Sequence, residues 1–392
     1  MKKTEEIIYR NRKGTDCNKW DALKERFGAE DLMPLWVADM DFEAPACVRE
    51  ALAACAADGL YGYYKVPESY YEAFMSWEKK YHGYETQRQW LRYSPGVVPA
   101  INWLVQILTE PGDGIGVMTP VYYPFMNAVK DNGRTLVDCP LKEDNGRYTM
   151  DLERFRELAG QMKLFILCSP HNPVGRVWSY EELKELLDCC KENGIFVLAD
   201  EIHHDLIAGD KEHVAAATVG DYSHMLVTMT AASKTFNLAA MKNSTVIIPD
   251  ETVREKWDAF TGRLHVGDGG MMGYVAVRAA YEGGREWLDG VLSIIKDNAS
   301  CLREALAAEL PEAVMSPLEG TYLAWVNLAA YVKPEDMKLV VQDMAGLAVD
   351  FGEWFGGSAY APFIRVNLAT STENVKLAAE RLCAAVKSYG GR

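Results

Sequence analysis

The middle of the sequence alternates short apolar runs with longer amphipathic segments, and this alternation restricts the chain to a small group of folds. Leu164–Cys168 and Ile195–Ala199 have the length and composition of strands, and Tyr180–Asn193 between them has the periodicity of a helix. Ser179 stands where that helix needs an N-cap. The two strand segments are apolar throughout, which is typical of strands buried on both faces of a parallel sheet.

The same alternation extends in both directions along the chain. Further strands are predicted at Ile115–Thr119, Arg134–Cys139, Met225–Met229 and Thr245–Ile248. Further helices are predicted at Pro99–Leu108, Phe125–Asn132 and Asp151–Ala159. Repeated strand–helix units of this length predict an α/β domain whose mainly parallel sheet is covered by helices on both faces.

The pattern changes after Gly283. A long helix is predicted at Arg285–Glu309 and ends before Pro311. Beyond it, strands are predicted at Thr321–Asn327, Leu347–Phe351 and Phe363–Asn367, and helices near Pro334–Met344 and Glu373–Ser388. This mixture predicts a smaller α+β domain. We expect a large domain over 43–284 and a small domain formed by 1–42 and 285–392.

Composition excludes several classes of partner. The formal net charge of -15 argues against a nucleic-acid partner, because binding to phosphate backbones requires a basic surface. Every apolar run is shorter than the roughly 18 residues of a membrane-spanning helix. The nine cysteines include no C-x-x-C pair, which indicates a reduced protein. We therefore expect a cytoplasmic protein that acts on a small molecule, with no nucleic-acid or membrane partner.

Polar residues follow three of the predicted strands. Ser169–Gly175, Asp200–Asp205 and Thr230–Phe236 each begin where a strand ends. The carboxyl ends of neighbouring parallel strands meet at one edge of a sheet, where ligands of such folds bind. These three segments are therefore expected to line a single crevice.

The side chains in these segments suit a site for pyridoxal 5'-phosphate (PLP). PLP needs a lysine that forms a Schiff base and a carboxylate that keeps the ring nitrogen protonated, for which Lys234 and Asp200 are candidates. Its phosphate needs backbone N–H groups, which the turn Ser94–Val98 could supply at the start of a helix. Arg365 could bind the carboxylate of an amino-acid substrate through two parallel hydrogen bonds.

A metal site is the alternative for one of these segments. His203, His204 and Asp205 are residue types that bind metals, but no H-E-x-x-H or similar ligand spacing accompanies them. We therefore expect no metal, and we expect His204 to have a structural role.

Eight motifs occur in order along nearly the whole chain: Pro34–Phe42, Tyr61–Tyr63, Ser94–Val98, Thr119–Phe125, Cys168–Arg176, Asp200–Asp205, Ser233–Asn237 and Phe363–Leu368. In this order they resemble the motifs of the fold-type I PLP enzymes, the aspartate aminotransferase superfamily. Within it the chain is most similar to the MalY/PatB branch of cystathionine β-lyases and C–S lyases. His203 supports this branch, because aminotransferases usually have a tyrosine there. The resemblance implies a seven-stranded sheet and a homodimer with active sites at its interface.

The resemblance also implies a role for each matching residue. Lys234 would carry the cofactor, Asp200 would face the ring nitrogen, and Tyr122 would stack on the ring. Asn172 and His203 would hydrogen-bond the phenolic oxygen of the cofactor. The residues implied at the phosphate are Gly96, Val97, Val98, Ser233 and Lys242, with Tyr63 reaching the phosphate of the neighbouring subunit. Arg365 would hold the substrate α-carboxylate. Tyr123 and Trp36 are further candidates for substrate contact, with plain packing as the alternative.

The leading hypothesis for the reaction is α,β-elimination from L-cystathionine or L-cysteine, which would give pyruvate, ammonia and a thiol. In this reaction the freed amine of Lys234 would act as the general base at Cα. The alternative is a class I/II aminotransferase, which requires the same residue types. A third hypothesis is a binding or regulatory protein that holds PLP with little turnover.

Overall fold

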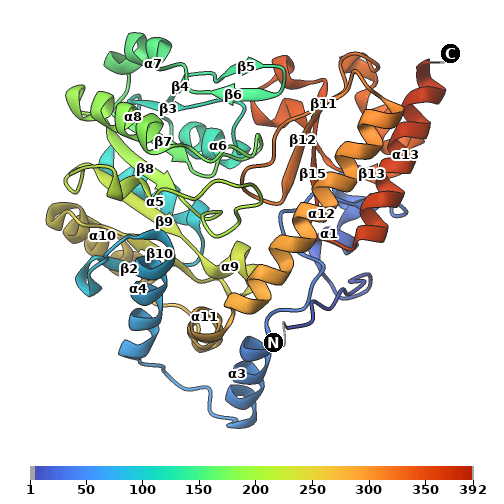
Figure 1. Ribbon diagram of the computed structural model, residues 1–392. Helices are drawn as coiled ribbons and strands as arrows, with labels where there is room; N and C mark the ends of the chain where they lie inside the picture. Colours follow the sequence, from blue (N-terminus) through green and yellow to red (C-terminus); the bar gives the residue numbers. More distant parts are fainter. Residues whose placement is uncertain (1–4, 391–392) are drawn as a thin grey trace.

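The computed structural model describes residues 5–390, and a seven-stranded sheet lies at its centre (Figure 1). In spatial order its strands are β2 (Leu91–Ser94), β10 (Ser244–Ile247), β9 (Leu226–Thr230), β8 (Phe196–Asp200), β7 (Leu164–Cys168), β3 (Gly114–Val117) and β4 (Thr135–Asp138). Only β10 runs opposite to its neighbours. The prediction of a mainly parallel α/β sheet is therefore confirmed.

Helices cover both faces of this sheet because its strands are apolar on both sides. Leu164 and Ile166 of β7 pack among the buried residues of α5 (Val97–Leu108), α6 (Tyr123–Asp131) and α10 (Glu251–Leu264). The alternate residues Phe165 and Leu167 pack among those of α7 (Leu152–Leu158) and α8 (Tyr180–Glu192). Ser179 caps α8 as predicted, accepting a hydrogen bond from the backbone of Glu182 in a capping box.

The large domain contains four further helices: α3 (Ala46–Ala57), α4 (Glu68–His82), α9 (Ala232–Thr235) and α11 (Met271–Gly283). Helix α11 packs against both α3 and α4, which are joined by an exposed loop (Figure 1). Leu60, Tyr61 and Tyr63 in this loop are exposed, and Tyr63 is fully so. None of the helices within residues 5–390 is both long and apolar enough to cross a bilayer.

The C-terminal part forms a second, smaller sheet next to two long helices. Its antiparallel strands follow the order β11 (Val314–Met315), β12 (Leu323–Asn327), β15 (Phe363–Asn367) and β14 (Asp350–Phe351). Helix α12 (Arg285–Glu309) packs against α13 (Thr372–Gly390) beside it (Figure 1). The predictions of α12 and β15 are correct at both ends.

The N-terminal segment joins this smaller part through a parallel pair of short strands, β1 (Met33–Pro34) and β13 (Leu347–Ala348). This pairing supports the division that we propose, a large domain over 43–284 and a small domain formed by 1–42 and 285–392, of which residues 1–4 and 391–392 lie outside the described part. The N-terminal segment also contains the short helices α1 (Asn18–Asp21) and α2 (Leu23–Phe27).

The structure corrects three predictions in the C-terminal part. Leu347–Phe351 is not one strand, because β13 pairs with β1 whereas β14 pairs with β15 in the other sheet. Pro334–Met344 is helical but not a regular α-helix, since a 3-10 turn at Pro334–Asp336 precedes a π-helix at Leu339–Met344. The strand predicted from Thr321 begins at Leu323, because Thr321 has a φ of +70° and cannot extend it.

The remaining elements are short. The hairpin of β5 (Lys142–Asp144) and β6 (Arg147–Thr149) forms a separate two-stranded sheet. The 3-10 turns are Arg88–Trp90, Ala159–Gln161, Ala216–Thr218, Ala239–Met241, Gly352–Phe355 and Ser358–Tyr360. The predicted strands of the large sheet lie within two residues of the observed ones. Strand β2 is not among the predicted strands: its sequence Leu-Arg-Tyr-Ser has a single aliphatic residue, and only its two end residues are buried.

Candidate active site

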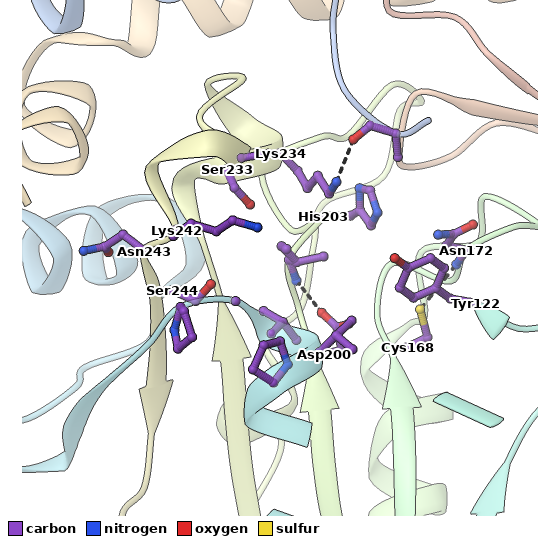
Figure 2. A pocket seen from close by; sticks show the side chains of 18 residues that line it. Tyr122, Cys168, Asn172, Asp200, His203, Ser233, Lys234, Lys242, Asn243 and Ser244 are labelled. Atoms are coloured by element: carbon purple, nitrogen blue, oxygen red, sulfur yellow. Dashed lines mark hydrogen bonds between the residues drawn. The ribbon is translucent and has the colours of Figure 1, made fainter. Parts of the chain in front are cut away.

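A cavity of about 200 Å³ opens at the carboxyl ends of β7, β8 and β9, beside the N-terminus of α5 (Figure 2). It is lined by Ala38, Pro95, Gly96, Val97, Val98, Pro99, Tyr122, Cys168, Asn172, Asp200, Ile202, His203, Ser233, Lys234, Ala239, Lys242, Asn243 and Ser244. Ten of these belong to the sequence-predicted site. The expectation that the three polar segments line one crevice is therefore confirmed.

Lys234 lies in the short helix α9, which follows β9, and its side chain points into this cavity (Figure 2). Its Nζ donates a hydrogen bond of 2.6 Å to the carbonyl oxygen of Ala38. Burial lowers the pKa of Lys234 to about 8, and the cation of Arg365 acts in the same direction against the carboxylates of Asp39 and Asp200. Lys234 therefore provides far more neutral amine near neutral pH than a solvent-exposed lysine does.

Asp200 is the last residue of β8 and is buried at the base of the cavity. Its Oδ1 accepts a hydrogen bond of 3.0 Å from the backbone N–H of Ile202, two residues further on. Burial raises the pKa of Asp200 to about 7, although that hydrogen bond and the amine of Lys234 favour the ionised form. A cation placed next to this carboxylate would restore its negative charge.

His203, Asn172 and Tyr122 line the cavity from the loops after β8, β7 and β3. His203 is buried, and burial holds its pKa well below the usual value, so its ring is neutral. Among residues 5–390, no group hydrogen-bonds its Nδ1. Tyr122 is the N-cap of α6, and its backbone N–H donates to the carbonyl of Asn172 at 3.0 Å, which joins the two loops.

One end of the cavity can bind an anion. Helix α5 begins at Val97, with Gly96 as its N-cap, so the free N–H groups of its first turn lie at the cavity wall. Ser233 and Lys242 face this end (Figure 2). Lys242 has a left-handed backbone, φ +49°. A hydroxyl, an ammonium and a helix N-terminus together favour a phosphate-sized anion.

Arg365 lies on β15 outside the cavity lining and is buried. Its Nη1 donates to Oδ1 of Asn172 at 3.0 Å, and its Nη2 donates to the carbonyl of Trp36 at 3.2 Å. Nη2 also forms an ion pair with Asp350 on the adjacent strand β14. The Nε of Arg365 is buried and has no partner among the described residues. Arg365 therefore contacts the cavity through Asn172.

The other predicted site residues do not line the cavity. The indole Nε1 of Trp36 donates to the carbonyl of Lys19 at 2.9 Å, so this ring is held by the N-terminal segment. Tyr123 is half-buried on α6 beside Tyr122, with ring centroids 5.5 Å apart. Tyr63 is fully exposed in the loop between α3 and α4. The structure of a single chain does not bring these three residues into the cavity, and their contact with substrate or cofactor stays a prediction.

Several lining residues are not among the predicted site residues, although Ala38, Pro95 and Ile202 lie within the motifs. Ala38 contributes a backbone carbonyl, and Pro95, Pro99, Ile202 and Ala239 contribute apolar surface. Asn243 and Ser244 stand at the start of β10, and their proximity to Lys242 is the one signal that could have identified them. Asp350 is the least predictable, because it reaches the site only through its pairing with Arg365.

A buried polar cluster lies behind the cavity, centred on Asp205. Its carboxylate accepts hydrogen bonds from Trp77 at 2.9 Å and Thr235 at 2.8 Å, and it pairs with His82 at 2.9 Å and His204 at 3.1 Å. Burial alone would lower the pKa of His204, but the neighbouring carboxylates outweigh it and raise that pKa to about 9. This cluster joins α4, α9 and the loop after β8, and it gives His204 the structural contacts expected of it.

The same region brings metal-ligand residue types together. Glu78, His82 and His204 place one ligand atom each within 4.8 Å of one another, as do Glu201, His204 and His213. The imidazoles of this region already pair with the carboxylates of Asp205 and Glu201. The absence of a metal stays a prediction.

The chain is similar to a known protein family, to curated proteins and to solved structures. The family model for class I and II aminotransferases matches residues 30–382. Cystathionine β-lyase PatB of Bacillus subtilis strain 168 is 36% identical over 379 residues, which are 96% of this chain and 98% of that protein. Cystalysin from Treponema denticola, whose structure contains PLP, has a TM-score of 0.93 at 33% identity and covers 97% of this chain and 98% of its own. The PLP-bound C–S lyase from Staphylococcus hominis has a TM-score of 0.91 at 33% identity, with 98% of each chain covered.

Proposed function

The chain belongs to the family of class I and II aminotransferases, and from this membership we propose that it is a PLP-dependent carbon–sulfur β-lyase. It would split L-cystathionine or L-cysteine by α,β-elimination into pyruvate, ammonia and a thiol, which is homocysteine or sulfide. Support comes from the relative named cystathionine β-lyase, which aligns with 96% of the chain. The observation that carries the proposal is that Lys234 and Asp200 line one cavity, each with a pKa shifted by burial.

The residues of the cavity fit PLP. When bound, PLP supplies an aldehyde that takes up an amine and a ring that accepts the electron pair released when a bond at Cα breaks. Lys234 offers the amine, and Asp200 is buried at the base of the cavity, where its carboxylate could pair with a protonated ring nitrogen. Nδ1 of His203, which has no hydrogen-bond partner among residues 5–390, is available for a ring substituent. The N-terminus of α5, with Ser233 and Lys242, suits a phosphate.

We propose that Lys234 holds the cofactor and, once the substrate amine has displaced it, removes the Cα proton as a general base. The lowered pKa of Lys234, about 8, provides neutral amine for this step. A thiolate then leaves from Cβ. Asp200 would be anionic during turnover, because a protonated ring nitrogen next to it offsets the effect of burial on its pKa.

The roles of the other residues follow from their positions. We propose that Tyr122 stacks on the cofactor ring and that Asn172 and His203 hydrogen-bond its phenolic oxygen. Gly96, Val97, Val98, Ser233 and Lys242 would bind the phosphate. Arg365, held next to Asn172, would bind the α-carboxylate of the substrate, with Tyr123 and Trp36 as further contacts.

We also propose that the enzyme works as a cytoplasmic homodimer with shared active sites. The support for shared sites is the exposed, aromatic loop with Leu60, Tyr61 and Tyr63, which a second subunit would cover. In that dimer Tyr63 would reach the phosphate in the neighbouring subunit. The support for the cytoplasm is that all nine cysteines are free thiols.

A substrate panel tests the reaction. The purified enzyme with PLP is incubated with cystathionine, cysteine, cystine and pairs of common amino and keto acids, and pyruvate, thiol and new amino acids are measured. We expect pyruvate and a thiol without any keto-acid acceptor. Turnover that requires an acceptor would replace the proposal by an aminotransferase. Bound PLP without either product would replace it by a binding protein.

A further inference from the structure

The carbonyl oxygen of Ala38 accepts two hydrogen bonds at the edge of the cavity. One comes from Nζ of Lys234 at 2.6 Å, drawn as a dashed line in Figure 2. The other comes from the hydroxyl of Tyr322 at 2.9 Å. A carbonyl oxygen has two lone pairs, so both donors can bind at once. The free amine of Lys234 and the hydroxyl of Tyr322 thus share one acceptor, the carbonyl oxygen of Ala38.

Ala38 is held in place by its neighbours. The side-chain amide of Asn367 donates to the carbonyls of Val37 at 2.6 Å and Asp39 at 2.7 Å, one on each side of Ala38. Asn367 ends β15 and is fully buried. The backbone on both sides of Ala38 is therefore fixed, and the Ala38 carbonyl itself is bound by Lys234 and Tyr322.

Tyr322 is held equally firmly. Its side chain is fully buried, and its ring lies edge-on to His203 at a centroid distance of 6.0 Å. The residue before it, Thr321, has a φ of +70°, which is a strained backbone conformation for a β-branched residue. The N–H of Thr321 donates to the carbonyl of Leu206 at 2.7 Å, and this bond stabilises the strained turn against the loop after β8. Such strain persists where the surrounding structure requires it, and the positive φ places Tyr322 where its hydroxyl reaches Ala38.

In the described part of the chain, three charged groups lie around Lys234, and each comes from a different segment. Asp39 lies in the N-terminal segment, Asp200 ends β8, and Arg365 lies on β15. The ring of His203 faces Lys234 from the loop after β8 and is neutral because burial lowers its pKa. None of these groups hydrogen-bonds Nζ, whose one such partner among residues 5–390 is the carbonyl of Ala38.

We propose that Tyr322 is a positioning residue for Lys234: its hydroxyl orients the Ala38 carbonyl, which receives the lysine amine whenever that amine is free. The inference rests on the proposed function, in which Lys234 is released from the cofactor in each catalytic cycle. Because Tyr322 engages part of the acceptor capacity of the carbonyl, it also keeps this carbonyl from holding a protonated lysine too tightly. The amine then loses its proton more readily.

The variant Tyr322→Phe removes the hydroxyl and keeps the ring. In apo-protein, Lys234 is labelled with trinitrobenzenesulfonate over a range of pH and the product is located by mass spectrometry. We expect the labelling midpoint to rise by about half a pH unit or more, because the carbonyl then binds the ammonium form without competition. In holoenzyme we expect kcat at pH 7 to fall about fivefold and the acidic limb of its pH profile to move upward, with KM within about twofold.

Two comparisons decide the result. Tyr222→Phe removes another buried hydroxyl, which binds Asp188 far from the cavity, and should leave both readouts unchanged. Thr321→Gly keeps Tyr322 and accepts the positive φ without strain, so it should also keep the wild-type midpoint. An unchanged midpoint and pH profile in Tyr322→Phe would overturn the proposal. Failure of Tyr322→Phe to fold would also overturn it, since the hydroxyl would then be needed for structure. A normal Tyr322→Phe enzyme would still leave the lyase proposal intact.

Discussion

The guanidinium of Arg365 is paired with the carboxylate of Asp350, although the same guanidinium is the proposed anchor for the substrate carboxylate. Both side chains are almost fully buried, and their strands, β15 and β14, are neighbours in register. Burial raises the pKa of Asp350, while Arg365 favours its ionised form. The cation is thus neutralised before any substrate arrives, and a substrate carboxylate must share it with Asp350.

The ion pair of Arg365 and Asp350 predicts that replacing Asp350 destabilises the protein. Asp350→Ala leaves the cation of Arg365 buried next to neutral groups, and we expect a loss of about 3 kcal/mol in the free energy of unfolding. Urea unfolding of the apo-protein measures this loss. Glu353→Ala, at a nearby exposed position, is the control and should change the free energy by less than about 0.5 kcal/mol. Equal stability of the two variants would mean that Asp350 does not stabilise Arg365.

Replacing Arg365 itself should separate substrate binding from chemistry. Arg365→Lys keeps a positive charge but loses the planar group that binds a carboxylate through two parallel hydrogen bonds. We expect KM for cysteine to rise about tenfold to a hundredfold, with a smaller fall in kcat. Steady-state kinetics over a wide range of substrate concentration measure both constants. A wild-type KM would place the substrate carboxylate elsewhere.

Lys234 is the strictest test of the site. Lys234→Ala removes both the attachment point and the general base, so we expect loss of the visible absorbance of lysine-bound PLP and at least about a thousandfold loss of turnover. Absorbance spectra and pyruvate release measure these effects. Lys184→Ala, a partly exposed lysine on α8, should retain both. A Lys234→Ala enzyme that keeps the absorbance and the turnover would remove the basis of the proposed function.

Replacing Asp200 with asparagine should stabilise the apo-protein at high pH and reduce the activity of the holoenzyme. Its folded-state pKa, about 7, is raised above the usual value, so it contributes stability below about pH 4, which is lost as the pH rises to 7. Apo Asp200→Asn should therefore exceed apo wild type in unfolding free energy by about 2–4 kcal/mol at pH 8, with little difference at pH 4. Urea titrations at both pH values measure this difference.

The same variant should lose activity in the holoenzyme. A neutral amide cannot stabilise a protonated ring nitrogen, and we expect kcat to fall by about a hundredfold or more. Equal stability of apo wild type and Asp200→Asn at pH 8 would show that Asp200 carries no unpaired charge in the free site. Full activity would exclude it as the partner of the ring.

Much of the fold is predictable from local pattern. The β7 strand and the α12 helix have the predicted bounds, because a buried strand and a long amphipathic helix both carry a clear periodicity. The split of Leu347–Phe351 is not predictable in this way. The residues of β13 and β14 are all buried, so their pattern cannot indicate which of two sheets each one joins.

The candidate site divides along similar lines. Lys234, Asp200 and Asn172 follow strands that the pattern locates, and their types match the chemistry of the cofactor. The carbonyl of Ala38 has no sequence signature, since every residue has one. Tyr322 is distant from Ala38 in the sequence and meets it only because the N-terminal segment lies against the C-terminal part. Such tertiary contacts between backbone and side chain cannot be deduced from spacing.

The pairing of β1 with β13 sets an order for biosynthesis. Gln342 donates to the carbonyl of Phe27 across 315 residues of sequence, and Met33 pairs with Leu347 close by. A ribosome must therefore synthesise β13 before β1 can find its partner strand. During translation this N-terminal arm remains without its partner strand, and the wall that contains Ala38 can close over the site only at the last stage of folding.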